Sequence, residues 1–359
     1  MNRHSKILVL KSSLLKPSFV FPIFSEVTRL LSSVTLCLLC CFSPSNYLIC
    51  TLLIRLSNCT YNTFMLISVC SLILLDSMRF YFSVYFFTTM ECTFNLMLAA
   101  GISCSYVGLL YAFDFNGVDR NDPQSIRRRF VAAVVNNAGG ISITYAVLRR
   151  HHAHPFEVMG IHTNGALSAV VIPACLTSVC YLGTWVMTYI DGHIGSLFDL
   201  SQWRNNFSSL IWIRDTIMAP LTEELAFRAC TTTLVLQCVS PMLAVFIAPL
   251  PFALSHLHHV FDDMKRGQTR QQAVLRRVFQ MSYSYLFGAY ATFLFVRTGN
   301  ILAPIISHSI CNNMGLPLFE YIDQYPKRAT RTLLWCSYIF GFAAWICLLM
   351  PLTDANLYS

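Results

Sequence analysis

The amino-acid sequence predicts an all-α polytopic integral membrane protein. Of its 359 residues, 55% are hydrophobic and only 12% are charged, whereas soluble domains average about 25% charged residues. Several uncharged apolar runs are long enough to cross a bilayer as helices, which takes roughly 20 residues. Composition and run length together exclude an ordinary soluble domain.

Six apolar runs carry this prediction. In chain order they are Cys92–Phe113, Phe130–Leu148, Gly165–Ile190, Val278–Val296, Asn300–Phe319 and Thr332–Met350. Two further apolar stretches, Ala229–Ile247 and Phe252–Phe261, lie between the third and the fourth run. We therefore expect helices over these residues, packed into one bundle.

The first 91 residues differ from the rest of the chain. Their apolar runs are short and are interrupted by charges such as Arg29, Arg55 and Asp76. Met90 directly precedes the first complete run, which makes it an alternative start of the protein. We expect residues 1–91 to be an N-terminal extension that either adds one or two incomplete membrane segments or is not part of the working protein.

The net charge of +8 comes from 25 Lys and Arg residues against 17 Asp and Glu residues. The basic residues cluster at Arg127–Arg129, Arg149–Arg150, Lys265–Arg277 and Lys327–Arg331. Short basic clusters beside membrane spans usually contact lipid headgroups, so membrane lipid is the expected partner and nucleic acid is not. Because the clusters fall in successive loops, the positive-inside rule leaves the orientation open at this stage.

The chain contains 15 cysteines. Most fall inside apolar runs, among them Cys104, Cys175, Cys180, Cys336 and Cys347. This pattern predicts small buried hydrophobic residues rather than a disulfide framework.

The segment "APLTEELAFRAC" places three ionisable residues between apolar stretches. Pro220 suits the first turn of a helix, where its missing N–H costs nothing. Glu224 and Arg228 then share one face, while Glu223 is rotated by about 100°. We expect Arg228 to neutralise Glu224 and leave Glu223 for another role. A solvated ion pair is the alternative, although charges at membrane depth are functional by default.

The segment "PFALSHLHHV" is the second polar cluster. Pro249 and Pro251 should end one helix and allow the next to begin. Phe252 and His256 are then one turn apart, and His256 and His259 share a face. His256 lies deepest in the apolar run, so it is the candidate for acid–base chemistry.

Three histidines close to two glutamates also suggest a zinc site. However, the sequence contains no His-Glu-x-x-His motif, and neither glutamate has a histidine at zincin spacing. His258 and His259 run into Asp262 and Asp263, as expected at an interfacial helix end. Acid–base use of His256 is therefore preferred over metal binding.

The segment "APIISHSICNNMG" is the third cluster. Pro304 suits a helix start, and His308 and Asn312 lie four residues apart on one face. An imidazole N–H beside a carboxamide NH₂ forms a two-donor pair that suits an oxyanion. A hydrogen-bonded pair between helices is the alternative, but two further polar helix faces favour a functional site.

Together the three clusters supply a base, a second acid–base group and a pair of donors for an oxyanion. These are the groups that peptide-bond hydrolysis by activated water requires.

The strings "EELAFR", "FALSH" and "HSICN" resemble the three motifs of the type II CAAX prenyl endopeptidases, the Ras-converting enzymes of the endoplasmic reticulum. These motifs are Glu-Glu-x-x-x-Arg, Phe-x-x-x-His and His-x-x-x-Asn. Flanking strings such as "FGAYATFLFVRTGNILAP" and "PLTDANLY" resemble the eukaryotic enzymes as well. The resemblance covers residues 92–357 and does not include residues 1–91.

The resemblance implies a bundle of about eight transmembrane helices around a catalytic cavity open to the cytosol and to lipid. It implies an endopeptidase of the endoplasmic reticulum membrane that uses neither metal nor cofactor. Its substrates would be farnesylated or geranylgeranylated CAAX proteins, including Ras-like small GTPases. The enzyme would remove the last three residues, which follow the prenylated cysteine.

Carried onto this chain, the resemblance gives each motif residue a role. Glu223 and His256 would activate the water, and His308 and Asn312 would hold the oxyanion. Glu224, Arg228 and Phe252 would support the site by positioning and charge compensation.

Four alternatives remain open from the sequence. A non-proteolytic membrane scaffold on the same fold predicts loss of the motif residues, which are all present. A transporter or channel predicts polar residues through both leaflets rather than at one depth. A metal-dependent membrane protease would use the histidines. A thiol protease would use Cys230 or Cys311, although neither has a histidine at an obvious activating position.

Overall fold

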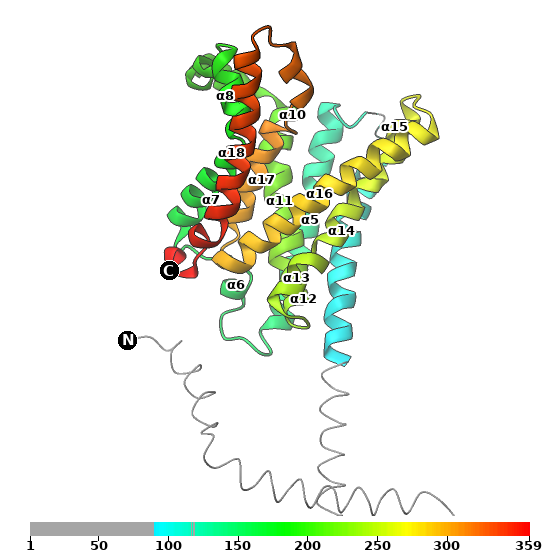
Figure 1. Cartoon of the computed structure of the whole chain (residues 1–359). Coiled ribbons are helices and arrows are strands. Elements are labelled where there is room, and N and C mark those ends of the chain that lie inside the picture. The colour runs from blue at the N-terminus through cyan, green and yellow to red at the C-terminus, as the bar shows by residue number, and fades with distance from the viewer. Residues whose placement is uncertain (1–89, 116, 118) are drawn as a thin grey trace, which may run out of the picture. The chain divides into compact units, whose positions relative to one another are not determined.

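The computed structural model describes residues 90–115, 117 and 119–359, and every regular element in these residues is helical. The predicted extension over residues 1–91 lies almost entirely outside the described residues. The predicted boundary near residue 91 therefore stays a prediction. The all-α prediction is confirmed for the described part of the chain (Figure 1).

The bundle is formed by long helices joined by short turns (Figure 1). The first described helix is Met90–Phe113. It is followed by α5 (Pro123–Leu148), α6 (Pro155–Val158), α7 (Ala166–Cys180), α8 (Leu182–Ile190), η2 (Ile194–Phe198), α9 (Leu200–Ser208), α10 (Leu210–Ile213), η3 (Arg214–Met218), α11 (Ala219–Glu224), η4 (Leu225–Thr232) and α12 (Thr233–Leu236). The remaining elements are α13 (Pro241–Ile247), α14 (Pro249–Ser255), η5 (His256–His258), α15 (His259–Lys265), α16 (Arg270–Thr298), α17 (Leu302–Met314), η6 (Phe319–Gln324), α18 (Arg328–Leu352) and η7 (Ala355–Tyr358).

Local sequence signals explain where the long helices begin and end. The Asp122 side chain accepts from two backbone N–H groups at the start of α5, and Pro123 occupies the first turn. Thr269 and Gln272 form a capping box at the start of α16, and Gly299 ends this helix with a left-handed φ of 65°. These caps satisfy backbone groups that a helix end otherwise leaves without partners.

Four helices in the described residues are long and apolar enough to cross a membrane: Met90–Phe113, Pro123–Leu148, Pro241–Met264 and Arg328–Leu352. The predicted run Gly165–Ile190 is broken at Tyr181 into α7 and α8, which meet at 70° and make a fifth span if counted as one. Among the described helices, the others of the expected eight are shorter or less apolar. For example, α17 has only 13 residues.

The chain from Leu210 to Leu236 is one continuous helical path that contains two π-helical segments. The segments η3 and η4 are π-helical, and α11 lies between them. Pro220 falls in the first turn of α11 as predicted, but no loop precedes it. Because proline lacks an N–H and its ring crowds the preceding turn, the widened turn before it accommodates the residue within the helix.

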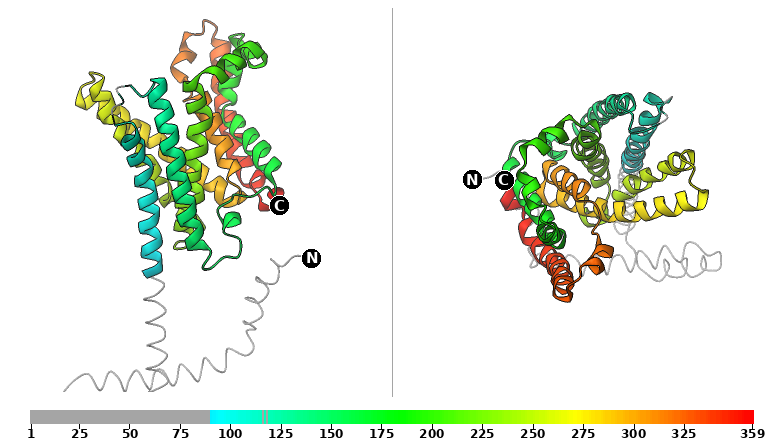
Figure 2. Two further views of the ribbon diagram at one scale, coloured as in Figure 1. Left: turned by 180° about the vertical axis from the view of Figure 1, so that it is seen from behind. Right: turned by 90° about the horizontal axis from the view of Figure 1, so that it is seen from above.

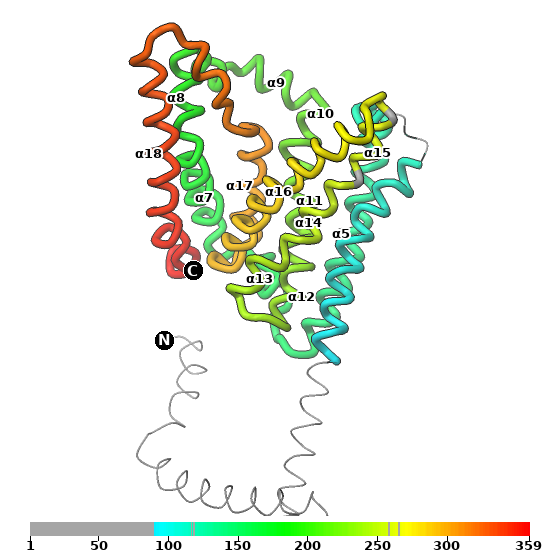
Figure 3. Tube along the Cα trace, turned by 45° about the vertical axis from the view of Figure 1, so that its right-hand side comes forward, coloured from blue at the N-terminus to red at the C-terminus, as the bar shows by residue number. Residues whose placement is uncertain are grey.

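The helices pack so that this continuous path lies between two groups of elements. Figure 2 shows Met90–Phe113 and α5 on one side of the bundle and α7, α8 and α18 on the other. Figure 3 shows α10 to α12 between these groups, with α14 and α16 beside them. α5 packs against η4, while α17 packs against η3 and α11. Residues from all three polar motifs are thereby brought to the centre.

The prediction of buried cysteines is wrong for most of the residues named. Cys104, Cys175, Cys336 and Cys347 are exposed on the bundle surface, and Cys180 is partly buried. The outer face of a membrane bundle contacts lipid, so a small apolar side chain is as suitable there as in the core. One disulfide, between Cys92 and Cys238, lies in the described part of the chain.

Candidate active site

Glu224 is the most deeply buried charge of the first motif. Its side chain is 0% exposed, and its Oε1 lies 3.0 Å from Nη1 of Arg228, which is 1% exposed. The predicted ion pair within the helix is therefore present. The same Oε1 lies 2.6 Å from Nδ1 of His308 on α17. One buried carboxylate thus joins the first motif to the third, a contact that spacing along one helix could not show.

Glu223 faces a different direction, as the 100° rotation predicts. Its side chain is 22% exposed, and Oε2 lies 3.9 Å from Nε2 of His308. His308 therefore stands between the two glutamates and presents Nδ1 to Glu224 and Nε2 to the side of Glu223. Since a carboxylate only accepts hydrogen bonds, Nδ1 is the donor in the short contact with Glu224.

Phe252 packs at the centre of the site. Its ring lies beneath the Arg228 guanidinium, with 4.6 Å between the guanidinium carbon and the ring centroid. The rings of His256 and His308 lie 5.2 Å and 6.0 Å from it, both edge-on. Phe287 of α16 covers the other side of His308 at 4.6 Å. These rings restrict the orientation of the imidazoles and keep Arg228 among aromatic faces, a favourable environment for a cation.

His256 lies at the end of α14, one turn after Phe252. Its Nδ1 is 3.0 Å from the Phe252 backbone oxygen. The Nδ1–H donates to this carbonyl, which leaves Nε2 as the acceptor nitrogen. The neighbouring His259 begins α15 and pairs with Asp262 of the same helix at 3.1 Å.

Asn312 lies one turn after His308 on α17, and its side chain is exposed to the cavity. Its Nδ2 donates to the backbone oxygen of Asp215 at 2.9 Å. Ser309, on the same helix, donates to the backbone oxygen of Thr216 at 2.7 Å. Both acceptors belong to the π-helical turn η3, where wide winding frees carbonyl groups.

Two cavities meet at His256. One, of about 130 Å³, is lined by Glu223, His256, Thr222 and three arginines, Arg120, Arg129 and Arg214. The other, of about 350 Å³, is lined by His256, His308, Asn312, Phe252 and Phe287, among others. The predicted site residues are therefore brought together, with Glu223 on one side of His256 and the His308–Asn312 pair on the other.

Polar residues inside the bundle hold the helix that carries the glutamates. Tyr106 Oη and Thr222 Oγ1 lie 2.9 Å apart, and both residues are buried. Asn137 of α5 donates from Nδ2 to the Thr222 backbone oxygen at 3.1 Å. These contacts fix the turn directly before Glu223. In the sequence, the only sign of these contacts is the polar Asn136–Asn137 pair inside an apolar run.

Comparison with known proteins identifies the family. Residues 205–314 match the family model described as type II CAAX prenyl endopeptidase Rce1-like. The chain is 42% identical over 253 residues to CAAX prenyl protease 2 of Caenorhabditis elegans, which covers 70% of this chain and 95% of that relative. It is 33% identical over 281 residues to CAAX prenyl protease 2 of Homo sapiens, with 75% and 84% covered. The chain belongs to the CAAX prenyl protease 2 family. No solved structure matches it.

Membership of the CAAX prenyl protease 2 family makes the chain a polytopic membrane protease and confirms the resemblance seen in the three motifs. It leaves the roles of the individual residues as predictions. Among the described residues, no group of three or more His, Cys, Asp or Glu side chains is arranged to hold a metal ion. Cys230 is buried in the core, whereas Cys311 lines the larger cavity with His308.

The three arginines of the smaller cavity could not be recognised from the sequence. Arg129 belongs to a basic cluster of the kind that contacts lipid headgroups, and Arg120 and Arg214 lie outside the basic clusters. Only the packing of the loop before α5 against η3 places them beside Glu223, and no spacing rule within one helix predicts that contact.

Proposed function

We propose that the protein removes the last three residues of prenylated CAAX proteins with a water molecule activated by Glu223 and His256. The observation that carries this proposal is the position of His256 between the two cavities, with Glu223 lining one and the His308–Asn312 pair lining the other. The scissile bond would lie at this junction, within reach of a base and of two donors.

The hydrogen-bond donors and acceptors of the site determine how hydrolysis would proceed. Glu223 or Nε2 of His256 accepts a proton from water, and the resulting hydroxide attacks the carbonyl carbon. The oxyanion then accepts hydrogen bonds from Asn312 and from Nε2 of His308. Since Nδ1 of His308 also donates to Glu224, this role requires both ring nitrogens of His308 to carry a proton. The proton taken from water passes to the leaving nitrogen as the peptide bond breaks.

The membrane setting suits a prenylated substrate. A prenyl chain partitions into the bilayer and brings the attached cysteine to membrane depth. The larger cavity, lined by Phe252 and Phe287, suits the cysteine side of the cleaved bond. The smaller cavity, with its arginines, suits the released tripeptide. Farnesylated or geranylgeranylated proteins such as Ras-like small GTPases are the proposed substrates.

The distribution of basic residues supports an orientation in the membrane. In Figure 1 the loops at one end of the bundle lie around residues 119–129, 199–214, 259–277 and 315–331, which we call the basic end. Of the described Lys and Arg residues it carries most, whereas the opposite end holds Arg149, Arg150 and Arg297. By the positive-inside rule the basic end faces the cytosol. The Cys92–Cys238 disulfide lies at the opposite end, which would then face the oxidising lumen of the endoplasmic reticulum.

The test compares Glu223→Gln with the wild type in membranes of expressing cells, using a farnesylated CAAX peptide. Tripeptide release is measured by mass spectrometry, with and without a chelator. We expect wild-type cleavage to survive the chelator and Glu223→Gln to lower the rate by about 10²- to 10⁴-fold, because general base catalysis is lost. Glu157→Gln, which changes an exposed glutamate on α6, is the matched control and should leave the rate unchanged.

Three outcomes would contradict this proposal. A rate for Glu223→Gln within twofold of wild type would remove the glutamate from the mechanism. Inhibition by the chelator would favour the metal-dependent alternative. Loss of activity in Cys311→Ala, with Glu223→Gln still active, would favour thiol chemistry.

A further inference from the structure

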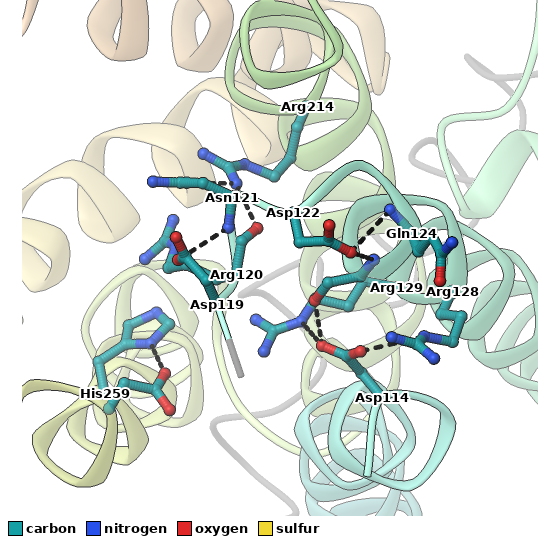
Figure 4. A network of polar contacts seen from close by, with 12 residues as sticks. Asp114, Asp119, Arg120, Asn121, Asp122, Gln124, Arg128, Arg129, Arg214 and His259 are labelled. Carbon is teal, nitrogen blue, oxygen red and sulfur yellow. Dashed lines mark hydrogen bonds and ion pairs between the residues drawn. The ribbon is translucent and has the colours of Figure 1, made fainter. Parts of the chain in front are cut away.

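The smaller cavity carries more positive charge than the proposed hydrolysis needs. Three arginines, Arg120, Arg129 and Arg214, line it together with two carboxylates, Asp215 and Glu223, and two histidines, His256 and His259. The arginines come from three elements: the loop before α5, α5 itself and η3 (Figure 4). Cations gathered from three elements into the cavity that holds the base suggest that an anion binds there.

Two of these arginines are held in place by acids. Nε of Arg129 donates to Asp114 at 2.8 Å. Arg214 makes a two-point contact with Asp215, with Nε and Nη2 at 2.7 Å and 3.0 Å from the two carboxylate oxygens. Both arginines are therefore held in place by a carboxylate, and Arg129 shares its partner Asp114 with Arg128.

Arg120 differs from its two neighbours. It is partly buried, and within the described residues no carboxylate lies within ion-pair distance of its guanidinium. Nη1 of Arg214 donates to its backbone oxygen at 2.9 Å, which fixes the loop (Figure 4). Burial, followed by the nearby charge of Arg214, lowers the pKa of Arg120. The Arg120 guanidinium thus lies in an environment that an additional anion would stabilise.

We propose that Arg120, supported by Arg214 and Arg129, binds the free C-terminal carboxylate of the substrate. This inference rests on the proposed function, because a CAAX substrate ends in such a carboxylate three residues after the cleaved bond. Arginine suits a carboxylate through paired, charge-assisted hydrogen bonds. The cavity would therefore recognise the end of a peptide chain rather than a particular last side chain.

The distances along the chain agree with this assignment. Arg214 and Glu223 are nine residues apart on one helical path, which is at most about 13 Å at the α-helical rise, since the π-helical residues of η3 rise less per residue. Three extended residues span about 10 Å. The remaining length is taken up by the arginine side chain and the attacking water. A tripeptide can thus reach from the junction at His256 to the arginines.

The experiment combines a protein variant with a chemical variant of the substrate. Wild type and Arg120→Gln are each given a farnesylated CAAX peptide as the free acid and as the C-terminal amide, and kcat/KM is measured for all four pairs. We expect the wild type to prefer the acid by about 10- to 100-fold, the effect of one hydrogen bond to a charged group. Arg120→Gln should lose this preference because its kcat/KM for the acid falls. Its kcat/KM for the amide should equal that of the wild type.

Arg128→Gln is the matched control. Arg128 lies in the same region, 3.2 Å from Asp114, but its side chain is 42% exposed and does not line the cavity. This variant should keep the preference for the acid.

Each other outcome has a defined meaning. Equal cleavage of acid and amide by the wild type would overturn the carboxylate site while leaving the proposed function intact. An equal fall for acid and amide in Arg120→Gln would also overturn it and would indicate a structural role or binding of a lipid headgroup phosphate. Absence of cleavage of either peptide by the wild type would instead overturn the proposed function.

Discussion

At the scale of single residues, Glu224 is the centre of the site. Its carboxylate contacts Arg228 of its own helix and His308 of α17, and all three side chains are nearly inaccessible to solvent. A buried charge that loses its partner is strongly destabilising, whereas a buried pair replaced by apolar residues is often tolerated. Stability and catalysis can therefore be separated at this position.

We expect Glu224→Gln to destabilise the protein by about 3–5 kcal/mol, because Arg228 then lacks its counter-charge. The double variant Glu224→Leu with Arg228→Leu should recover most of this stability. Both variants should lack activity, because His308 loses the carboxylate that orients it. Thermal unfolding in detergent and tripeptide release measure the two effects. An active double variant would show that Glu224 acts only in folding.

Contacts within one helix of the candidate site were predictable, whereas contacts between helices were not. Spacing along one helix predicted the Glu224–Arg228 pair and the separate direction of Glu223. The contact from Glu224 to His308 depends on how α17 packs against α11, and Arg120 depends on how a loop meets η3. Such contacts arise from tertiary packing, on which the periodicity of a single helix carries no information.

At the scale of elements, the close approach of α14 and α16 holds the second motif in place. A Cβ added at Gly288 of α16 would lie 2.9 Å from Cβ of Pro249 and 3.3 Å from the Phe252 ring. Arg228 donates from Nη2 to the Gly288 backbone oxygen at 3.3 Å. The missing side chain at this position thus lets α14 bring Phe252 and His256 against the first motif.

We expect Gly288→Ala to cost about 1–3 kcal/mol of stability, as overpacking does, and to lower activity by shifting α14. Gly139→Ala is the control. This glycine lies inside α5, and nothing lies within 4 Å of an added Cβ, so the change should be neutral or stabilise by up to about 1 kcal/mol. Thermal unfolding and cleavage rates are compared for the two variants. Equal effects of both would contradict the packing argument.

At the scale of the whole molecule, the sequence predicted the all-α membrane class but left the orientation open. Basic clusters fall in successive loops, and only the three-dimensional arrangement shows that most of them share one end. The Glu223 cavity is lined by Arg120, Arg129 and Arg214, which belong to that end. The proposed cytosolic access to the site follows from this arrangement.

A protease site inserted after Gly267 or after His151 tests the orientation. Gly267 lies in the turn between α15 and α16 at the basic end, and His151 lies in the turn after α5 at the opposite end. Exposed turns tolerate such insertions. In sealed vesicles with the cytosolic face outward, protease added outside should cut only after Gly267. After detergent it should cut at both positions. Cleavage only after His151 in sealed vesicles would reverse the orientation.

The continuous helix from Leu210 to Leu236 has a consequence for the length of the product. Arg214 and Glu223 belong to the same helical path, so their separation cannot change without unwinding it. Arg214 also holds the backbone of Arg120, so if Arg120 binds the carboxylate, this helix acts as a molecular ruler that measures back from the end of the substrate to the bond that is cut. A fixed count of three residues would then be a property of helix geometry rather than of side-chain recognition.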